Sequence, residues 1–486
     1  MLRYSQSMRL TANPPQWEYL FNPRSIAVVG VGTLSNPNNW ANSWVKTLIE
    51  LGFEGNLYPV GLNLNQIYNL KVYPSLNDIP GSIDYVIVSV SARSVPRLIE
   101  DCVSKGVKFV HLYTAGFSET GEEEDRKLEY KIAETAHKGG MRIIGPNSMG
   151  IYYPANHISW RLDFPWQGGV VAFLSQSGWN AADLIKMGAV RGIYFSKLVS
   201  YGNACDLNEI DFLEYFTHDP ESRIIASYIE GVKQGQRFFR VLKQAAKVKP
   251  VIILKGGRNE AGMRAAASHT GSLSGDEAIW HSLFQQSGAI RVYNLDEFAD
   301  TILAFLYLSA PKGKRVAIIG SGGGPSVQAA DDCESTGLVV SPLPTEVVDK
   351  LREFIPVAGT GLRNPIDSPF IMDNEKFKQI IEIVAAWPQI DLLIIHLGID
   401  FFFTLPGGRE SLKRNCEAVI NAVKGVTQPT AIVLRSCGSI EAVEAIADER
   451  ERFAQAGLPL YSSIACAAKA LSKLANYYQH IEADHA

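Results

Sequence analysis

A single histidine lies in a stretch of small and hydroxylated residues. His269 belongs to AAASHTGSLSG, residues 265–275, whose other members are alanine, glycine, serine and threonine apart from one leucine. A histidine of the core would be expected among bulky apolar neighbours, whereas these residue types favour a solvent-reachable loop. The stretch therefore predicts an imidazole that takes part in chemistry.

Three roles are open to His269. As a metal ligand it would need partners, but the other eight histidines show no spacing typical of a metal site. As the base of a catalytic triad it would need a nucleophile elbow, and the segment SQSG at 175–178 does not match that pattern. As a nucleophile it would need a partner that orients its ring and a site that stabilises phosphate. The third role can be checked against the rest of the chain.

Two features of the chain suit a nucleophilic histidine. Residues 175–178 separate an apolar strand pattern from a helical one, and the free N–H groups of a helix start attract an anion. The segment RIIASYIEG, residues 223–231, ends in Glu230, which predicts a carboxylate at the carboxyl edge of the same sheet. Such a carboxylate can fix the tautomer of an imidazole. On this argument alone, a solvated residue at a strand end explains Glu230 equally well.

A glycine-rich turn follows another apolar segment. SIAVVG, residues 25–30, runs into Gly30-Val31-Gly32 and then into a helical pattern. Such turns let a phosphate approach the backbone. The dinucleotide fingerprint, however, expects a glycine where Ser35 stands and a carboxylate after the second strand, where none occurs. Three interpretations of this turn remain: it binds nothing, it binds a dinucleotide, or it binds another phosphate-bearing nucleotide. The sequence favours the third.

Alternating strand and helix patterns divide the chain into three parts. β-branched runs such as SIAVVG and DYVIVSV are separated by helical patterns, and similar series begin at residues 168 and 314. This alternation is typical of parallel sheets covered by helices on both faces. The sequence predicts an α/β protein of three tandem domains: a Rossmann-like domain over 20–150 and two flavodoxin-like domains over 151–311 and 312–480.

The composition excludes several classes of protein. The 486 residues carry a formal net charge of -4 and no basic block, which argues against a nucleic-acid partner. The apolar runs fall far short of the roughly 20 residues that cross a bilayer, and the first residues lack the apolar core of a secretory signal. The six cysteines are scattered and never form a CxxC pair. We expect a cytoplasmic protein without metal or membrane partner.

Five segments resemble the α subunit of NDP-forming acyl-CoA synthetases, which include the ADP-forming acetyl-CoA synthetases and are relatives of succinyl-CoA synthetase. They are GPNSMG (145–150), SQSGWNAADL (175–184), YGNACDLNEIDFLEYF (201–216), YIEGVKQG (228–235) and AAASHTGSLSG (265–275). The likeness extends from about residue 20 to residue 475, and the SHTGS motif is highly specific in that setting. The resemblance implies a CoA-binding domain followed by two succinyl-CoA synthetase-like domains.

The resemblance also implies a reaction. Acyl-CoA, ADP and phosphate would be interconverted with a carboxylic acid, ATP and CoA through an acyl phosphate and a phosphohistidine. His269 matches the phosphorylated histidine, and Glu230 matches the carboxylate that orients it. The residues that match the cradle of its phosphate are Ser175, Gln176, Ser177 and Gly178.

Further site residues follow from the same resemblance. A second helix end aimed at the phosphohistidine would come from the third domain, either at Gly322, Gly323 and Gly324 or just after His396-Leu-Gly398. The residues that match the CoA pocket are Gly30, Gly32, Thr33, Ser35, Asn36, Val88, Ser89, Val90, Thr114, Ala115, Gly116 and, near the thioester, Asn147.

The chain departs from the family around the CoA pocket. The family usually carries a lysine shortly after the second strand, where this chain has Gly61-Leu-Asn63-Leu-Asn65. Ser148 stands where a cysteine is common, and Trp40-Ala41 where small residues are usual. These departures bear on the strength of CoA binding and on the acyl group accepted, but not on His269.

The sequence contains no ATP-grasp pattern and no Walker A motif. The resemblance therefore implies that ATP or ADP, with Mg, binds to a separate ATP-grasp β subunit in an α2β2 assembly. The alternative is a CoA- or acyl-CoA-binding regulatory or scaffold protein of the same fold without ligase activity. The presence of His269, Glu230 and the helix start at Gly178 favours the enzyme, since a sensor needs no nucleophile.

Overall fold

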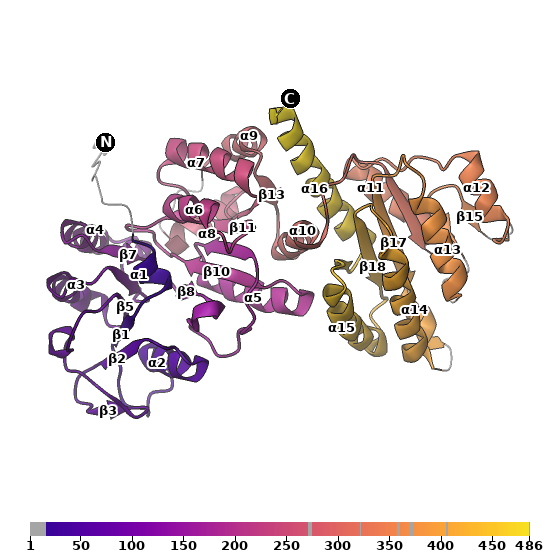
Figure 1. The fold of residues 1–486 in the computed structure, drawn as a ribbon. Coiled ribbons are helices and arrows are strands. Elements are labelled where there is room, and N and C mark those ends of the chain that lie inside the picture. Colours follow the sequence, from indigo (N-terminus) through magenta and orange to yellow (C-terminus); the bar gives the residue numbers. More distant parts are fainter. Residues whose placement is uncertain are drawn as a thin grey trace. The chain divides into compact units, whose positions relative to one another are not determined.

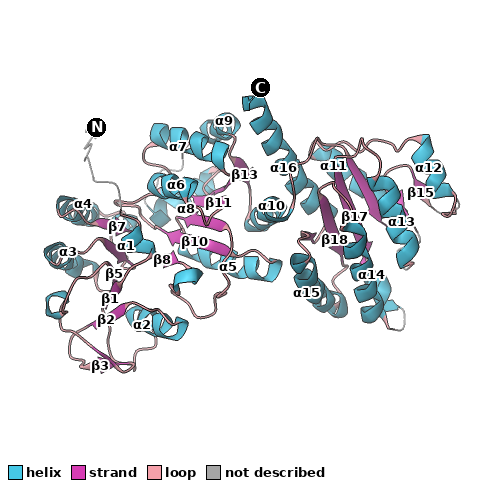
Figure 2. Ribbon diagram, viewed as in Figure 1, coloured by secondary structure: helices cyan, strands magenta, loops and turns pink. Residues whose placement is uncertain are grey.

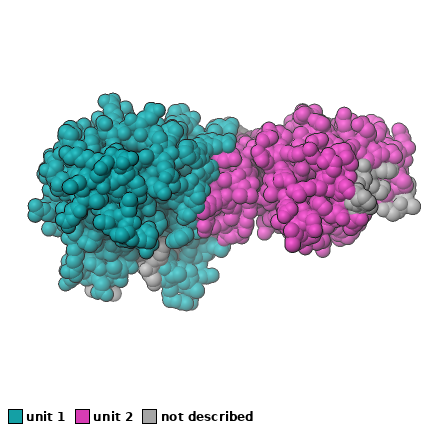
Figure 3. All heavy atoms as spheres, turned by 90° about the horizontal axis from the view of Figure 1, so that it is seen from below, with its two compact units in different colours: residues 1–182, 195–242, 255–282 teal, residues 183–194, 243–254, 283–486 magenta. Residues whose placement is uncertain are grey.

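The structure is a computed structural model that describes residues 16–270, 275–320, 322–356, 360–368, 373–404 and 407–485. Its strands form three large sheets that follow one another along the chain, with helices between the strands, and one two-stranded ribbon (Figure 1, Figure 2). By contacts the chain divides into two compact units, coloured separately in Figure 3. Unit 1 comprises Met1–Ala182, Phe195–Leu242 and Lys255–Ser282, and unit 2 comprises Asp183–Tyr194, Lys243–Leu254 and Leu283–Ala486.

The first sheet is parallel throughout and has the order β2-β1-β5-β6-β7. Its strands are β1 (Ser25–Val29), β2 (Asn56–Val60), β5 (Tyr85–Val88), β6 (Phe109–Leu112) and β7 (Arg142–Ile144). Its helices are α2 (Trp40–Leu51), α3 (Val95–Ser104) and α4 (Glu123–Lys138). Every residue of β1, β5 and β6 is buried, as expected for a parallel sheet covered on both faces.

The second sheet has the order β13-β12-β11-β9-β10-β8. Its strands are β8 (Gly150–Tyr152), β9 (Val171–Ser175), β10 (Phe195–Ser200), β11 (Ile224–Ile229), β12 (Val251–Lys255) and β13 (Ile290–Val292). Strand β9 pairs in parallel with β10 and β11, whereas β8 runs antiparallel to β10. The helices are α5 (Gly178–Arg191), α6 (Glu209–His218), α7 (Gly235–Val248), α8 (Glu260–Thr270), α9 (Glu277–Ser287) and α10 (Leu295–Tyr307).

The third sheet has the order β15-β16-β14-β17-β18-β19, and only its β15–β16 pair is antiparallel. Its strands are β14 (Val316–Gly320), β15 (Gly361–Leu362), β16 (Ile366–Asp367), β17 (Leu392–Gly398), β18 (Thr430–Arg435) and β19 (Leu460–Tyr461). Its helices are α11 (Gly323–Ser335), α12 (Thr345–Arg352), α13 (Asn374–Ala385), α14 (Gly408–Val423), α15 (Ile440–Gln455) and α16 (Ile464–His485).

The remaining elements are short. They are α1 (Glu18–Phe21), the β3–β4 ribbon (Gln66–Ile67 and Leu70–Lys71) and the 3-10 turns η1 (Leu76–Asp78), η2 (Ala92–Ser94), η3 (Ser118–Thr120), η4 (Pro154–Asn156) and η6 (Ile399–Thr404). Within the described ranges, no helix has the length and apolar character needed to span a bilayer. The predicted α/β class with its succession of sheets is confirmed, while the domain boundaries at residues 150 and 311 stay predictions.

Candidate functional site

The predicted phosphate cradle is a tight turn between β9 and α5 in unit 1. The Ser175 hydroxyl donates to the Ser177 carbonyl at 2.6 Å and accepts from the Ser177 N–H at 3.2 Å. The Ser177 hydroxyl accepts from the Asn180 N–H at 3.3 Å, so it caps the first turn of α5. Because α5 follows a parallel strand, its N-terminus lies at the carboxyl edge of the sheet, where its dipole favours an anion.

Gln176 joins this turn to the strand that carries Glu230. The Gln176 N–H donates to the Tyr228 carbonyl at 3.1 Å, and its side-chain oxygen accepts from the N–H groups of Glu230, at 2.6 Å, and Gly231, at 3.1 Å. The Glu230 side chain is 4% exposed, and its carboxylate accepts a hydrogen bond from the Tyr228 hydroxyl at 3.1 Å. The structure therefore brings the cradle and the predicted orienting carboxylate together.

Tyr228 is suited to hold this carboxylate at neutral pH. Burial raises the pKa of the Tyr228 hydroxyl above its usual value, and the neighbouring Glu230 raises it further. The phenol therefore stays protonated and remains a donor. Sequence reasoning gave Tyr228 no role, although it lies two residues before Glu230 at the end of β11, a spacing that favours one face of the sheet for both side chains.

His269 lies in the last turn of α8, and its backbone is described but its side chain lies outside the described part. The chain enters α8 beside the end of β11, because the Gly256 N–H donates to the Ile229 carbonyl at 2.9 Å. A Cβ at Gly256 would lie 2.6 Å from the Tyr228 hydroxyl oxygen, so only glycine allows this approach. The segment that leads from β12 into α8 thus begins next to the end of β11, one residue before Glu230.

The stretch NEAGMRAAA, residues 259–267, is helical from Glu260 as its pattern predicts, but the loop expected from Ser268 onward does not begin there. Residues 265–270 continue helix α8, while 271–274 lie outside the described residues. Three consecutive alanines precede Ser268, and alanine has the highest helix propensity of all residues. Small residues here therefore extend a helix rather than end it.

The predicted CoA residues gather at the carboxyl edge of the first sheet. Gly30 has φ +109°, and a Cβ there would collide with the Ser89 carbonyl, so the turn after β1 packs closely on the end of β5. The Asn42 side chain fixes the turn from the first turn of α2, because it accepts from the Gly32 N–H and donates to the Gly32 carbonyl, both at 3.0 Å. Thr33 and Ser35 share a hydroxyl hydrogen bond of 2.8 Å farther along the turn, before Asn36.

The segments after β5 and β6 are joined to this edge by Thr114. Its hydroxyl donates to the Val90 carbonyl at 2.8 Å, just beyond Val88 and Ser89. Its carbonyl accepts from the Asn147 N–H at 2.9 Å, and Asn147 adopts φ +58°. Ala115 and Gly116 follow on the outer side of the same loop, where Ala115 is exposed. The structure thus places the predicted CoA residues on one edge, although their contact with CoA stays a prediction.

An aromatic pair lies over this edge. Trp40, the first residue of α2, packs against Tyr113 with ring centroids 5.2 Å apart. Trp40 is 41% exposed, and burial raises the pKa of Tyr113 to about 12. Sequence reasoning noted Trp40 as a departure from the family but missed Tyr113, because no spacing rule links residues so far apart.

The two alternatives in the third domain differ in structure. Gly322 is the N-cap of α11, a full helix that begins with Gly323 and Gly324, whereas only the short 3-10 turn η6 follows Gly398. The Asp367 carboxylate already accepts from the Gly322 N–H at 2.6 Å. Geometry therefore favours α11 as the helix start, but Asp367 occupies one of its donors. A phosphate-binding role for these glycines stays a prediction.

His396 is a buried neutral residue next to this helix start. Burial and the neighbouring Arg435 lower its pKa to about 4. A Cβ at Gly320 would collide with its ring, which explains the glycine at the end of β14. The imidazole is therefore packed into the sheet of unit 2 and is uncharged at neutral pH.

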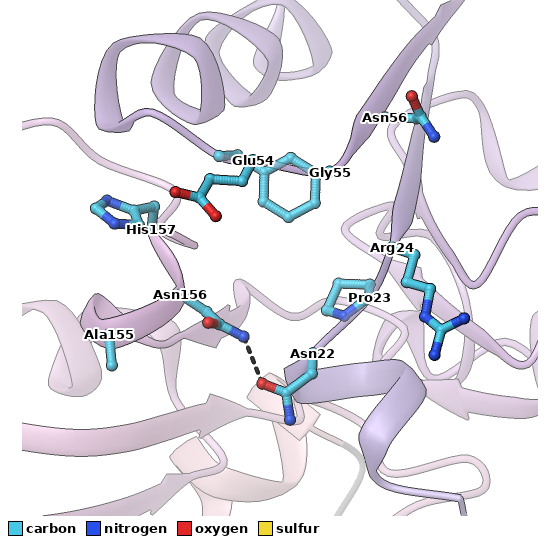
Figure 4. A pocket seen from close by; sticks show the side chains of 10 residues that line it. Asn22, Pro23, Arg24, Glu54, Gly55, Asn56, Ala155, Asn156 and His157 are labelled. Atoms are coloured by element: carbon cyan, nitrogen blue, oxygen red, sulfur yellow. Dashed lines mark hydrogen bonds between the residues drawn. The ribbon is translucent and has the colours of Figure 1, made fainter.

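A separate pocket of about 460 Å³ lies at the amino ends of β1 and β2 (Figure 4). It is lined by Asn22, Pro23, Arg24, Phe53, Glu54, Gly55, Asn56, Ala155, Asn156 and His157. Two of these residues are joined, because the Asn156 side-chain amide donates to the Asn22 side-chain oxygen at 2.6 Å. Ligands of parallel α/β sheets bind beyond the carboxyl ends of the strands, so this pocket lies at the opposite edge from the candidate site.

Comparison with known proteins agrees with this geometry. Residues 24–154 match the model of a CoA binding domain, and residues 168–305 match that of the succinyl-CoA ligase like flavodoxin domain. The chain is 36% identical to the α subunit of acetate–CoA ligase [ADP-forming] II of Pyrococcus furiosus, over 93% of this chain and 97% of the relative. The chain belongs to the NDP-forming acyl-CoA synthetase family.

Two further relatives support the assignment to this synthetase family. The α subunit of acetate–CoA ligase [ADP-forming] I of Pyrococcus furiosus is 36% identical over 94% of this chain and 96% of its own length. The dinucleotide forming acetyl-coenzyme A synthetase 1 of Ca. Korarchaeum cryptofilum, solved in complex with phosphate and ADP, superposes with a TM-score of 0.83 at 30% identity. That match covers 96% of this chain and 98% of the other. The predicted family is confirmed.

We expect Trp40→Ala to weaken the use of CoA by this synthetase. The Trp40–Tyr113 pair covers the edge that a CoA molecule would cross, and an aromatic contact contributes about 0.5–1.5 kcal/mol beyond its buried area. The KM for CoA should therefore rise about 2- to 12-fold while kcat stays near the parent value. Steady-state kinetics with varied CoA measure this. Trp166→Ala, at a tryptophan that is 59% exposed, is the control, and equal KM values in the two variants would contradict the prediction.

Proposed function

We propose that this chain is the α subunit of an ADP-forming acyl-CoA synthetase. It interconverts acyl-CoA, ADP and phosphate with a carboxylic acid, ATP and CoA. The observation that carries the proposal is the hydrogen-bonded link from the helix start at Ser177 through Gln176 to the buried Glu230. An anion site beside an orienting carboxylate is the environment that a phosphorylated histidine requires.

The first step takes place at the thioester. A phosphate oxygen attacks the carbonyl carbon, the C–S bond breaks and CoA leaves as the thiolate, so that an acyl phosphate forms. N–H groups in the first turn of α5 stabilise the phosphate charge during this attack. The edge that carries Gly30, Ser89 and Thr114 holds the CoA in this step.

The second step moves the phosphoryl group to His269. A ring nitrogen attacks phosphorus, the P–O bond to the acyl group breaks, and the carboxylic acid leaves as its carboxylate. The Glu230 carboxylate accepts a hydrogen bond from the other ring nitrogen, and so keeps the attacking nitrogen unprotonated and stabilises the positive ring that forms. Tyr228 holds Glu230 through its own hydrogen bond.

The last step requires a nucleotide site. We infer that an ATP-grasp β subunit binds ADP or ATP with Mg and receives the phosphoryl group, in an α2β2 assembly. Two relatives that cover nearly all of this chain are named α subunits, which supports a second subunit. The Korarchaeum relative was solved with phosphate and ADP, which supports ADP as the acceptor. A cytoplasmic location stays a prediction.

Labelling with radioactive ATP tests this proposal. The chain mixed with an ATP-grasp β subunit, Mg and γ-labelled ATP should acquire about one acid-labile, base-stable phosphate per chain, because phosphohistidine is formed by reversal of the last step. Phosphate analysis after denaturing electrophoresis measures the label. Without the β subunit no label is expected. Labelling of the isolated chain would contradict the separate nucleotide subunit, and absence of label in the complete mixture would contradict the function.

A further inference from the structure

The loop after β6 is held by a carboxylate that follows it in the chain. Glu119, in the turn η3, accepts from the Gly116 N–H at 2.6 Å with one oxygen and from the Phe117 N–H at 3.1 Å with the other. Gly116 has φ +102°, a conformation that a side chain would strain. The carboxylate therefore fixes the backbone at Gly116 and Phe117, in the loop whose Thr114 carbonyl accepts from the N–H of Asn147, the residue predicted to lie near the thioester.

A buried asparagine from the second sheet completes this support. Asn203 follows β10 and is 1% exposed. Its side-chain nitrogen donates to Glu119 at 2.5 Å and to Glu129 at 3.0 Å. Its side-chain oxygen lies 3.5 Å from the amide nitrogen of Asn147. One amide thus links Glu119, which holds Gly116 and Phe117, to Asn147, the residue predicted to lie near the thioester.

The position of Asn203 is itself fixed on its backbone side. Its N–H donates to the Pro146 carbonyl at 3.0 Å, and its carbonyl accepts from the Lys233 ammonium at 3.0 Å. Lys233 also donates to the Ala204 carbonyl at 2.9 Å. The amide therefore points at Glu119 from a rigid position.

A second carboxylate holds the other half of the same turn. Glu129, on α4, accepts from the Ser118 hydroxyl at 2.6 Å and from the Ser118 N–H at 3.1 Å. The backbone of α8 approaches η3, so the turn that Glu129 holds lies beside the helix that carries His269. Glu119 thus holds the N–H groups of Gly116 and Phe117, and Glu129 holds Ser118, the first residue of η3.

We propose that Glu119, held by Asn203, is a positioning residue for the thioester step. This inference rests on the proposed function. The carboxylate keeps the N–H groups of Gly116 and Phe117 turned inward and sets the path of the loop that faces the acyl end of CoA. Because Glu129 still holds Ser118 when Glu119 is replaced, we expect the loss of Glu119 to act on the thioester step more than on phosphorylation of His269.

The variant Glu119→Gln tests this inference. Glutamine keeps the size but has one acceptor oxygen, so its NH2 group must face an N–H donor of Phe117, Gly116 or Asn203. Formation of acetyl-CoA from acetyl phosphate and CoA, by the complex of chain and β subunit, should fall about 10- to 100-fold, the loss expected for a hydrogen bond to a charged group. Labelling of His269 by ATP should change less than about twofold. A merely structural role would lower both rates together.

Amide hydrogen exchange supplies a readout that does not depend on activity. Exchange across 114–117 should become at least about tenfold faster in Glu119→Gln, whereas exchange in α8 should stay as in the parent. The matched control is Glu122→Gln, three residues along the chain at an exposed position. If both variants behave alike in exchange and in acetyl-CoA formation, the inference is overturned. If the parent complex itself acquires no label from γ-labelled ATP, the proposed function fails instead, and the exchange result still decides whether Glu119 holds the loop.

Discussion

Replacing His269 with alanine is expected to abolish both the phosphoenzyme and the overall synthetase reaction. No other ring nitrogen then receives the phosphoryl group, and removal of a nucleophile that acts with its partners as a unit costs about 10⁴-fold or more in kcat. Alanine is the strongest helix former, so α8, which ends at Thr270, should keep its fold. Labelling by γ-labelled ATP and the rate of acetyl-CoA formation in the presence of the β subunit measure the effect.

The control for this variant is His281→Ala. His281 is exposed on α9, and its loss should leave both readouts at the parent level. Thermal unfolding of both variants should coincide with that of the parent. Label that persists in His269→Ala at the parent level would assign the phosphate to another residue and would refute the role proposed for His269.

The architecture could be predicted because its strands are buried on both faces. Every residue of runs such as SIAVV and FVHL is buried, and these mostly apolar runs alternate with helices along the chain. The antiparallel strand β8, Gly150–Tyr152, was not predicted. It has three residues, too few for any periodicity, and its place is set by pairing with Leu198, Val199 and Ser200 of β10.

The part of the candidate site that could be predicted is the part that follows from the order of the parallel strands. Glu230 and the turn at Ser175 end neighbouring parallel strands, so the sequence placed them on one edge. Other contacts at the two sheet edges join residues that lie far apart in the chain, and these could not be predicted. Asn203 reaches Glu119 and Asn147, and Trp40 reaches Tyr113, through packing of loops that no local pattern encodes.

Glu230→Gln is expected to slow phosphorylation of His269 about 10³- to 10⁴-fold. In a serine protease, the corresponding change from carboxylate to amide leaves the catalytic histidine in the wrong tautomer and lowers kcat about 10⁴-fold. The carboxylate is an acceptor only, so it selects the tautomer of His269 whose attacking nitrogen is unprotonated. In the variant, the glutamine oxygen can accept from the Tyr228 hydroxyl, which turns its NH2 group toward the imidazole. The ring then accepts with the orienting nitrogen and carries its proton on the attacking one. Single-turnover labelling measures the rate.

Tyr228→Phe separates the charge of Glu230 from its orientation. Phenylalanine removes the hydroxyl that donates at 3.1 Å and keeps the ring, so Glu230 stays a carboxylate and still selects the reactive tautomer. Labelling should therefore slow only about tenfold, the loss of one positioning hydrogen bond to a charged group. Both variants should keep the KM for CoA, because Gly30, Ser89 and Thr114 follow strands of the first sheet, whereas Tyr228 and Glu230 lie at the edge of the second. If Glu230→Gln is labelled as fast as Tyr228→Phe, the carboxylate does not select the tautomer, and its burial beside Gln176 serves the fold alone.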